Sequence, residues 1–201
     1  MSENRSGRGI VVGVLAACLL TACGARQEQS VAHAAIAVPD AVAPFRLAAS
    51  LQDIMISLVD VNADAVWESV SEEWDKDGYR EHKPVSDEEW RTVRNQAIAL
   101  QESADLLLIP GRHLVDPGRE LEDADVAGIL GAKAIEAAIT TQRAEFDAFS
   151  LALHEVSREI VTAVDKRDVV ALRTIGARLD TVCETCHARF WYPDAQQAPT
   201  R

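Results

Sequence analysis

Basic charge and long apolar runs are both scarce in this 201-residue chain. Its 20 Lys and Arg face 32 Asp and Glu, which gives a formal net charge of −12. Nucleic acid and anionic lipid surfaces would repel such a chain, so neither is expected as a partner. The apolar run Ile10–Leu20 is shorter than the roughly 20 residues that a stable bilayer-spanning helix needs.

Strand patterns and catalytic constellations are missing as well. No segment shows a convincing alternation of apolar and polar residues, so the sequence predicts an all-α fold. We find no combination of nucleophile, base and oxyanion donors suited to hydrolysis. The chain is therefore expected not to be an enzyme.

Cysteine is rare, with four residues in the chain, and two of them form a motif near its end. The sequence Cys183-Glu184-Thr185-Cys186-His187 has the Cys-x-x-Cys-His spacing of a c-type haem attachment site. On a helix, sulfurs three residues apart share a face, and the imidazole follows closely enough to reach the iron. The motif predicts one covalent haem c, with Cys183 and Cys186 forming the thioethers and His187 as an axial iron ligand.

Two other readings of the cysteine pair stay open. A structural zinc site uses four ligands, usually from a second Cys or His pair at similar spacing, and the sequence offers no such pair. A thioredoxin-like redox pair would be expected near a βαβ pattern, which is not found. The corresponding alternative function is a structural or metal-binding lipoprotein.

The N-terminus predicts export. Residues 1–22 combine a basic start with a short apolar run, as in a signal peptide. The tetrapeptide that ends at Cys23 resembles the lipobox of bacterial lipoproteins, and the one that ends at Cys18 fits the same pattern. Cys23 is preferred because it leaves the longer apolar run before the cleavage point. The expected location is periplasmic and lipid-anchored, and Gly24 favours the outer membrane.

The remaining chain divides into a flexible tether (23–43), a helical domain (44–193) and a polar tail (194–201). A first helix is expected from Pro44, with an inward seam of Ala48, Leu51, Met55, Leu58, Asn62 and Val66, continued by Trp67, Val70 and Trp74. The run from Asp75 to Pro84 is expected to be a loop.

Three more helices follow. Ser86 and Glu89 form a capping box that opens the second helix, whose seam is Trp90, Val93, Ala97, Leu100, Ala104 and Leu107. After a connection over 111–130, a continuous third helix is expected from Ile135 to Ala163. The fourth places Leu172, Leu179 and Cys186 inward and ends at Pro193, with Gly176 allowing a neighbour to approach closely.

Amphipathic helices with Cys-x-x-Cys-His near the end of the last one resemble the class II cytochromes c, the group of cytochrome c′ and cytochrome c556. The resemblance covers about residues 44–193, and its specific element is Cys183 to His187. It implies an antiparallel four-helix bundle with haem between the helices, exchanging electrons with a redox partner. Members of this group are often dimers, so a homodimer is an open expectation here.

The sixth position on the iron is left open by the resemblance. A first-helix Met fills it in the c556-like members, which suits one-electron transfer, whereas an apolar side chain blocks it in cytochrome c′, whose five-coordinate iron binds NO and CO. Met55 is the only methionine besides Met1 and is the candidate ligand. Leu51, one turn earlier, is the alternative residue facing the iron.

Two arginines are candidates for contacts with the haem propionates, because charge-assisted bonds to carboxylates favour Arg. They are Arg46 on the first helix and Arg189 directly after the motif. The acidic charge of the chain makes a basic redox partner the expected kind of partner protein.

Overall fold

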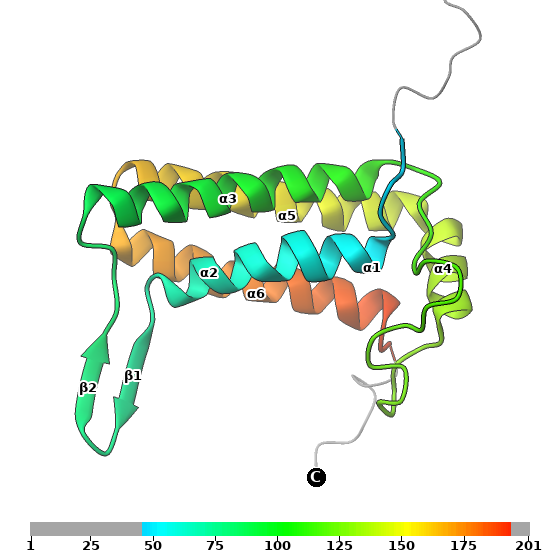
Figure 1. Cartoon of the computed structure of the whole chain (residues 1–201), viewed down its shortest axis with the longest axis horizontal. Helices are drawn as coiled ribbons and strands as arrows, with labels where there is room; N and C mark the ends of the chain where they lie inside the picture. Colours follow the sequence, from blue (N-terminus) through cyan, green and yellow to red (C-terminus); the bar gives the residue numbers. More distant parts are fainter. Residues whose placement is uncertain (1–45, 194–201) are drawn as a thin grey trace, which may run out of the picture. The chain divides into compact units, whose positions relative to one another are not determined.

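Residues 46–193 are described by a computed structural model, and most of them are helical (Figure 1). The predicted helical class is thereby confirmed. The predictions for residues 1–22, 23–43 and 194–201, including lipidation of Cys23, lie outside the described residues. Within residues 46–193, no helix combines the length and apolar character needed to cross a membrane.

The first helical segment runs from Leu51 to Glu68 and has three parts: α1 (Leu51–Ile54), the π-helix η1 (Met55–Asp60) and α2 (Val61–Glu68). It begins later than predicted, because a capping box sets its start. The Ser50 hydroxyl accepts a hydrogen bond from the Asp53 amide at 3.1 Å, and the Asp53 carboxylate accepts from the Ser50 amide at 3.1 Å.

The inward face of this segment differs from the predicted seam by one residue in its middle. Leu51 and Val66 are buried as expected, but Met55, Leu58 and Asn62 are only half-buried. The buried positions are instead Leu51, Ile54, Val59, Ala63 and Val66. The step of five from Ile54 to Val59 reflects the extra residue of the π-helix, which rotates everything that follows it relative to a regular helix.

A short antiparallel hairpin follows, β1 (Glu72–Asp75) paired with β2 (Gly78–Glu81), where the sequence predicted more of the helix seam and then a loop. Trp74 was placed on the inward seam, and this is wrong: it is 80% exposed and stacks on Tyr79 with ring centroids 5.0 Å apart. Arg173, from the last helix α6 (Val169–Phe190), holds the hairpin by donating to a Glu81 carboxylate oxygen at 2.6 Å.

Helix α3 (Asp87–Leu108) agrees with its prediction in every respect. The Ser86 hydroxyl accepts from the Glu89 amide at 3.2 Å, and the Glu89 carboxylate accepts from the Ser86 amide at 2.8 Å. Its predicted seam is buried throughout: Trp90, Val93, Ala97, Leu100, Ala104 and Leu107.

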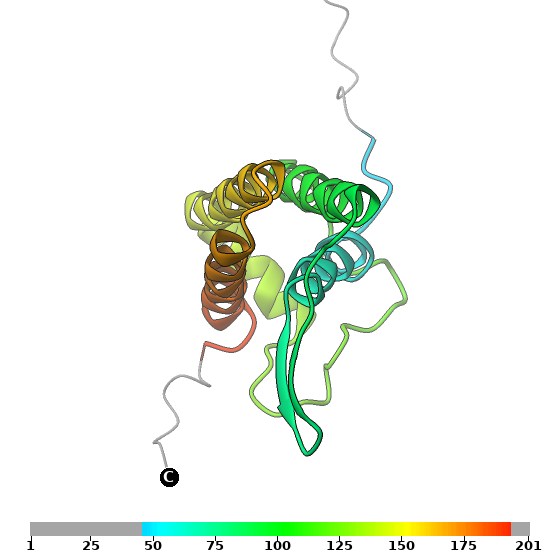
Figure 2. The same ribbon diagram turned by 90° about the vertical axis from the view of Figure 1, so that its left-hand side faces the viewer.

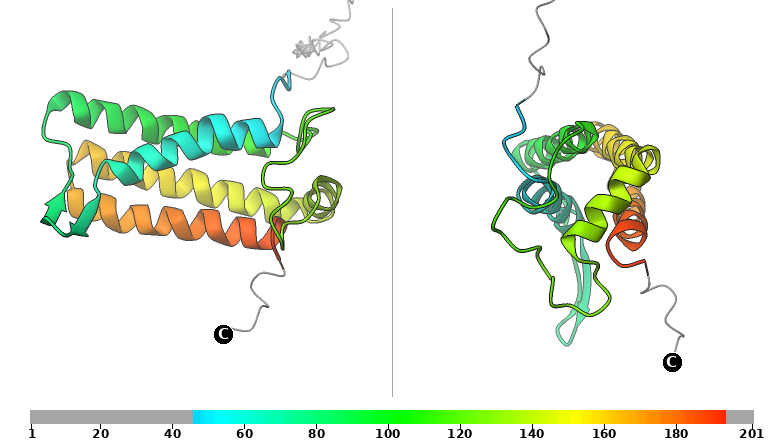
Figure 3. Two further views of the ribbon diagram at one scale, coloured as in Figure 1. Left: turned by 60° about the horizontal axis from the view of Figure 1, so that its bottom comes forward. Right: turned by 90° about the vertical axis from the view of Figure 1, so that its right-hand side faces the viewer.

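The expected continuous third helix is wrong, because the chain breaks at Gln142. It forms α4 (Ala132–Thr141) and α5 (Arg143–Asp165), and Gln142 leaves the helical region with φ −118° and ψ 38°. The break lets α4 turn across the end of α5 and α6 (Figure 3) while Ile135 and Ile139 remain buried. Periodicity alone could not show it, since both halves keep the helical repeat.

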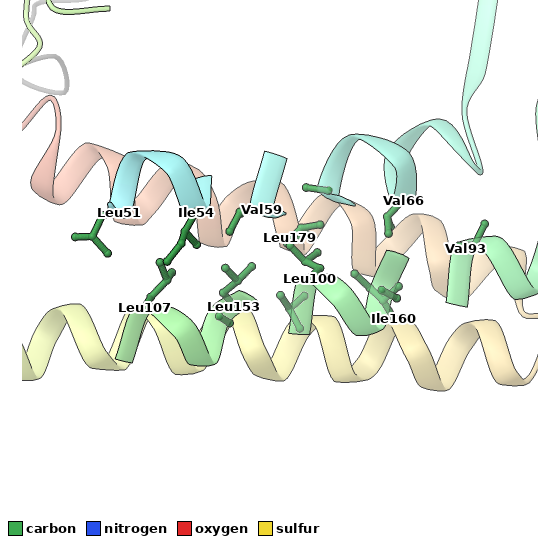
Figure 4. Packing of buried hydrophobic residues seen from close by; sticks show 14 of the residues in the cluster. Leu51, Ile54, Val59, Val66, Val93, Leu100, Leu107, Leu153, Ile160 and Leu179 are labelled. Carbon is green, nitrogen blue, oxygen red and sulfur yellow. The ribbon is translucent and has the colours of Figure 1, made fainter. Parts of the chain in front are cut away.

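Helix α6 (Val169–Phe190) begins at Asp168, whose carboxylate accepts from the Ala171 amide at 2.9 Å, and it ends before Pro193 as predicted. Helix α5 packs against both α3 and α6, and α2 packs against α3 and α6, so the long helices lie side by side around a shared interior (Figure 2). Leu51, Ile54 and Val59 project into that interior from the first helical segment (Figure 4).

We expect Ser86→Ala to lower the free energy of unfolding by about 1 kcal/mol, because it leaves the Glu89 amide at the start of α3 without its side-chain partner. Chemical denaturation monitored by circular dichroism checks this. Thr92→Ala is the control, since the Thr92 hydroxyl donates to a helix carbonyl on an exposed face and caps nothing. Equal effects of the two substitutions would contradict the role of the cap.

Candidate functional site

A cavity of about 330 Å³ lies between the first helical segment, α5 and α6. It brings together Met55 from η1 with Cys183, Cys186 and His187 from α6. Apolar side chains form most of its remaining wall, among them Val59, Ala63, Trp67, Phe146, Phe149 and Leu153. The residues that the sequence singled out for haem binding therefore meet at one largely apolar site.

Both thiols lie on the inward side of α6 and are half-buried. Burial raises the pKa of Cys183 to about 11 and that of Cys186 to about 12. The thiols are therefore protonated at neutral pH. Redox-active and metal-binding cysteines normally have a lowered pKa, so this environment disfavours the redox reading of the pair.

His187 is the most polar group of the α6 wall. Burial lowers the pKa of its imidazole, and the nearby carboxylate of Asp60 acts in the opposite direction. The ring lies beside two aromatic side chains that follow the motif, with centroid distances of 5.8 Å to Trp191 and 6.3 Å to Tyr192. The imidazole is thus held in a partly desolvated position and favours its neutral form, the form that binds a metal.

Met55 and Leu51, the two candidates for the residue facing the iron, have different surroundings. Met55 lines the cavity together with His187, whereas Leu51 belongs to the core and lines a separate hollow near Arg112 and Arg143. The first helical segment therefore presents Met55 to the site.

A smaller cavity of about 170 Å³ adjoins the first and shares Met55, Asp60 and His187 with it. Its outer wall comes from the connection between α3 and α4, which the buried side chain of Gln52 holds in place. The Gln52 carbonyl oxygen accepts from the Glu122 amide at 2.7 Å, and its amide group donates to the Glu120 carbonyl at 3.3 Å. The long connection thus covers the Met55 and His187 side of the site.

The predicted propionate contacts, Arg46 and Arg189, are not among the residues that line the cavity. Arg46 is exposed ahead of α1, and Arg189 donates to a Glu145 carboxylate oxygen at 2.9 Å while lying over the Phe190 ring. Their role toward a haem stays a prediction.

Sequence reasoning missed two acidic residues of the cavity wall, Asp60 and Asp64. The pKa of Asp60 is raised because its carboxylate is partly buried, and the charge of His187 partly offsets that effect. None of the residues that line this cavity is a lysine or arginine. The helical pattern gave no signal for these positions, because the π-helix changes which residues of the first segment face α6.

Gly176 confirms the predicted close approach. The indole nitrogen of Trp67 donates to the Gly176 carbonyl at 2.9 Å, and a Cβ placed on Gly176 would lie 3.4 Å from Cδ1 of Trp67. Trp67 in turn lines the cavity. This contact fixes the distance between the first helical segment and α6 at one end of the site.

Comparison of the chain with family models, with curated proteins and with solved structures finds no match in any of the three. Among residues 46–193, no cluster of three or more His, Cys, Asp or Glu side chains is arranged to hold a metal ion.

We expect Gly176→Ala to raise the free energy of unfolding by up to about 1 kcal/mol, because alanine is the better helix former and its Cβ makes an ordinary contact with Trp67. Gly176→Leu should instead lower it by about 1 to 3 kcal/mol, since the larger side chain must displace the indole. Thermal unfolding and Trp fluorescence measure both effects. The same sign for the two variants would contradict the close contact.

Proposed function

We propose that this chain is a covalent c-type haem protein that carries single electrons, built as an antiparallel four-helix bundle of the class II cytochrome c type. The observation that carries the proposal is that Cys183, Cys186, His187 and Met55 all line one cavity. The resemblance noted in the sequence gives this arrangement its meaning, and the packing of α2, α3, α5 and α6 is compatible with it.

The cavity suits a large flat apolar cofactor with polar groups at one edge. Its volume lies within the range of about 300 to 1,000 Å³ that is usual for ligand and cofactor sites. Aromatic and aliphatic side chains from α5 and α2 supply the walls. With acidic side chains and no lysine or arginine in that wall, the propionates of a haem would have to point toward solvent.

The donor set favours haem over zinc. Cys183, Cys186 and His187 share the cavity wall with two carboxylates, but no three His, Cys, Asp or Glu side chains within residues 46–193 are arranged to hold a metal ion. In a covalently attached haem each sulfur would end as a neutral thioether bonded to carbon, which suits the apolar surroundings of Cys183 and Cys186.

A bound haem would supply reversible one-electron chemistry at its iron. His187 would hold the iron from the α6 side, with Met55 facing it from the first helical segment. A thioether ligand stabilises the ferrous state and raises the reduction potential. Phe146, Phe149 and Leu153 exclude water from the site, which limits reorganisation when charge changes.

The partner and location of the protein follow from charge and from the N-terminal motif. Asp60 and Asp64 stand at the cavity, and Glu122 and Asp123 line the adjoining one, so the site is bordered by acidic groups. We propose a basic redox partner protein that approaches this side. A periplasmic position with a lipid anchor at Cys23, and assembly as a homodimer, complete the proposal.

We expect the double variant Cys183→Ser and Cys186→Ser, exported with the haem attachment machinery, to retain almost no haem after denaturation and acid extraction, since no thioether can form. The pyridine haemochrome spectrum measures the retained haem. Thr185→Ser, an exposed change inside the motif, is the matched control and should keep full haem content. Equal retention in both would disprove covalent attachment at these sulfurs.

We expect Met55→Leu to convert a low-spin spectrum into a high-spin one and to allow rapid CO binding to the ferrous form, because the substitution keeps the volume but removes the sulfur. Leu58→Ala, a half-buried change in η1 outside the cavity wall, should keep the low-spin spectrum. A parent protein that is already high-spin and binds CO rapidly would instead support the gas-binding alternative, with Met55 as a wall residue.

A further inference from the structure

The π-helix η1 lies where the first helical segment forms the cavity wall. It spans Met55–Asp60 between two regular α-helical stretches. A turn of this kind holds one residue more than an α-helical turn. Such turns are rare in proteins, and those that occur are often found at functional sites. We call Met55–Asp60 the wide turn.

The part of the segment that follows the wide turn is firmly placed. Val59, Ala63 and Val66 are buried in the core, and Trp67 is bonded to the Gly176 carbonyl. Asp60 faces the cavity beside them. These contacts fix the rotation of α2 about its axis. With α2 fixed, the number of residues in the preceding turn decides which of its side chains face the core and the cavity.

In an α-helix, side chains four residues apart lie one above the other. If a regular helix preceded Val59 and Asp60, Met55 would lie over Val59 and Ile56 would lie over Asp60. The place over Val59 is the core position, which lines neither cavity, and the place over Asp60 is the wall position. The observed spacing is five, which gives the core position to Ile54, 1% exposed, and the wall position to Met55. Ile56 is 36% exposed and lines the smaller cavity but not the larger one.

We propose that the wide turn selects a methionine instead of an isoleucine as the side chain that faces the candidate haem site from the first helical segment. The chemical meaning of this inference rests on the proposed function. A thioether sulfur can occupy the sixth position on iron, whereas a branched alkyl side chain cannot. The extra residue thus decides between a filled and an open coordination position.

Two polar side chains bond to backbone carbonyls at the wide turn. The amide group of Asn62 donates to the Leu58 carbonyl at 2.6 Å, and the Ser57 hydroxyl donates to the Asp53 carbonyl. The same kind of bond occurs in regular helices, as from Thr92 to a backbone carbonyl in α3, so it accompanies the wide turn without defining it.

Two single-residue deletions in the full-length chain test the proposal as a matched pair. Each removes one isoleucine and lets the segment become a regular α-helix. Deletion of Ile56 keeps Ile54 in the core and Met55 on the wall. Deletion of Ile54 moves Met55 into the core position, a volume-conserving change, and leaves Ile56 on the wall.

The decisive readout does not require haem. In protein labelled with ¹³C-methyl methionine, where Met1 is the only other methionine, we expect a nuclear Overhauser contact between the Met55 methyl group and the His187 ring, which shares both of its cavities. The contact should persist when Ile56 is deleted and disappear when Ile54 is deleted. With haem attached, the same pair should be low-spin and high-spin respectively.

Retention of the contact in both deletions, or its loss in both, would overturn the proposal. Should either deletion fail to fold, the exchange Ile54→Met with Met55→Ile in the intact turn gives the same decision: position 54 lines neither cavity, so the methionine methyl must leave the His187 ring. Absence of haem in the parent protein and in all variants would contradict the proposed function. The contact between the Met55 methyl group and the His187 ring would still test the role of the wide turn.

Discussion

The arrangement of this protein depends on keeping one face of α6 turned toward the first helical segment. That face carries Cys183, Cys186 and His187, and the opposing segment carries Met55. At the far end the Trp67 indole bonds to the Gly176 carbonyl, and at the near end Gln52 ties the α3–α4 connection to the first segment. The Trp67 contact sets the separation of the two helices at its end of the cavity, while Gln52 fixes the connection that covers the other end.

The cavity wall is chemically uneven in a way that fits its proposed use. Aromatic and aliphatic groups from α5 form one wall, burial raises the pKa of both thiols, and Asp60 and Asp64 stand at the first-segment side. A covalently bound flat cofactor would bury this apolar lining, so haem binding is expected to stabilise the fold as well as to supply its chemistry.

The regular parts of the fold were predictable from the sequence, and the irregular parts were not. Helix α3 has an unbroken 3,4 repeat and a capping box, so both its start and its buried face were correct. The first segment departs from that repeat because the wide turn adds a residue, and Trp74 left the predicted seam for an exposed hairpin. Gln142 separates α4 from α5, but the spacing of apolar residues keeps its helical repeat across the break.

The residues of the candidate site also divide into those that the sequence predicted and those that it did not. Cys183, Cys186 and His187 could be named from a short motif, and Met55 from its rarity in the chain. Asp60 and Asp64 could not, because their positions depend on the rotation that the wide turn introduces. Local motifs carry chemistry in sequence, whereas the groups around them are selected by tertiary packing.

The central claim is that the sulfurs of Cys183 and Cys186 bind a haem covalently. Its most direct test is the intact mass, under denaturing conditions, of the protein exported together with a functional haem attachment system. We expect the polypeptide mass to be increased by one haem. A colourless protein whose mass lacks that increment would contradict the claim and leave a helical domain with two half-buried free thiols.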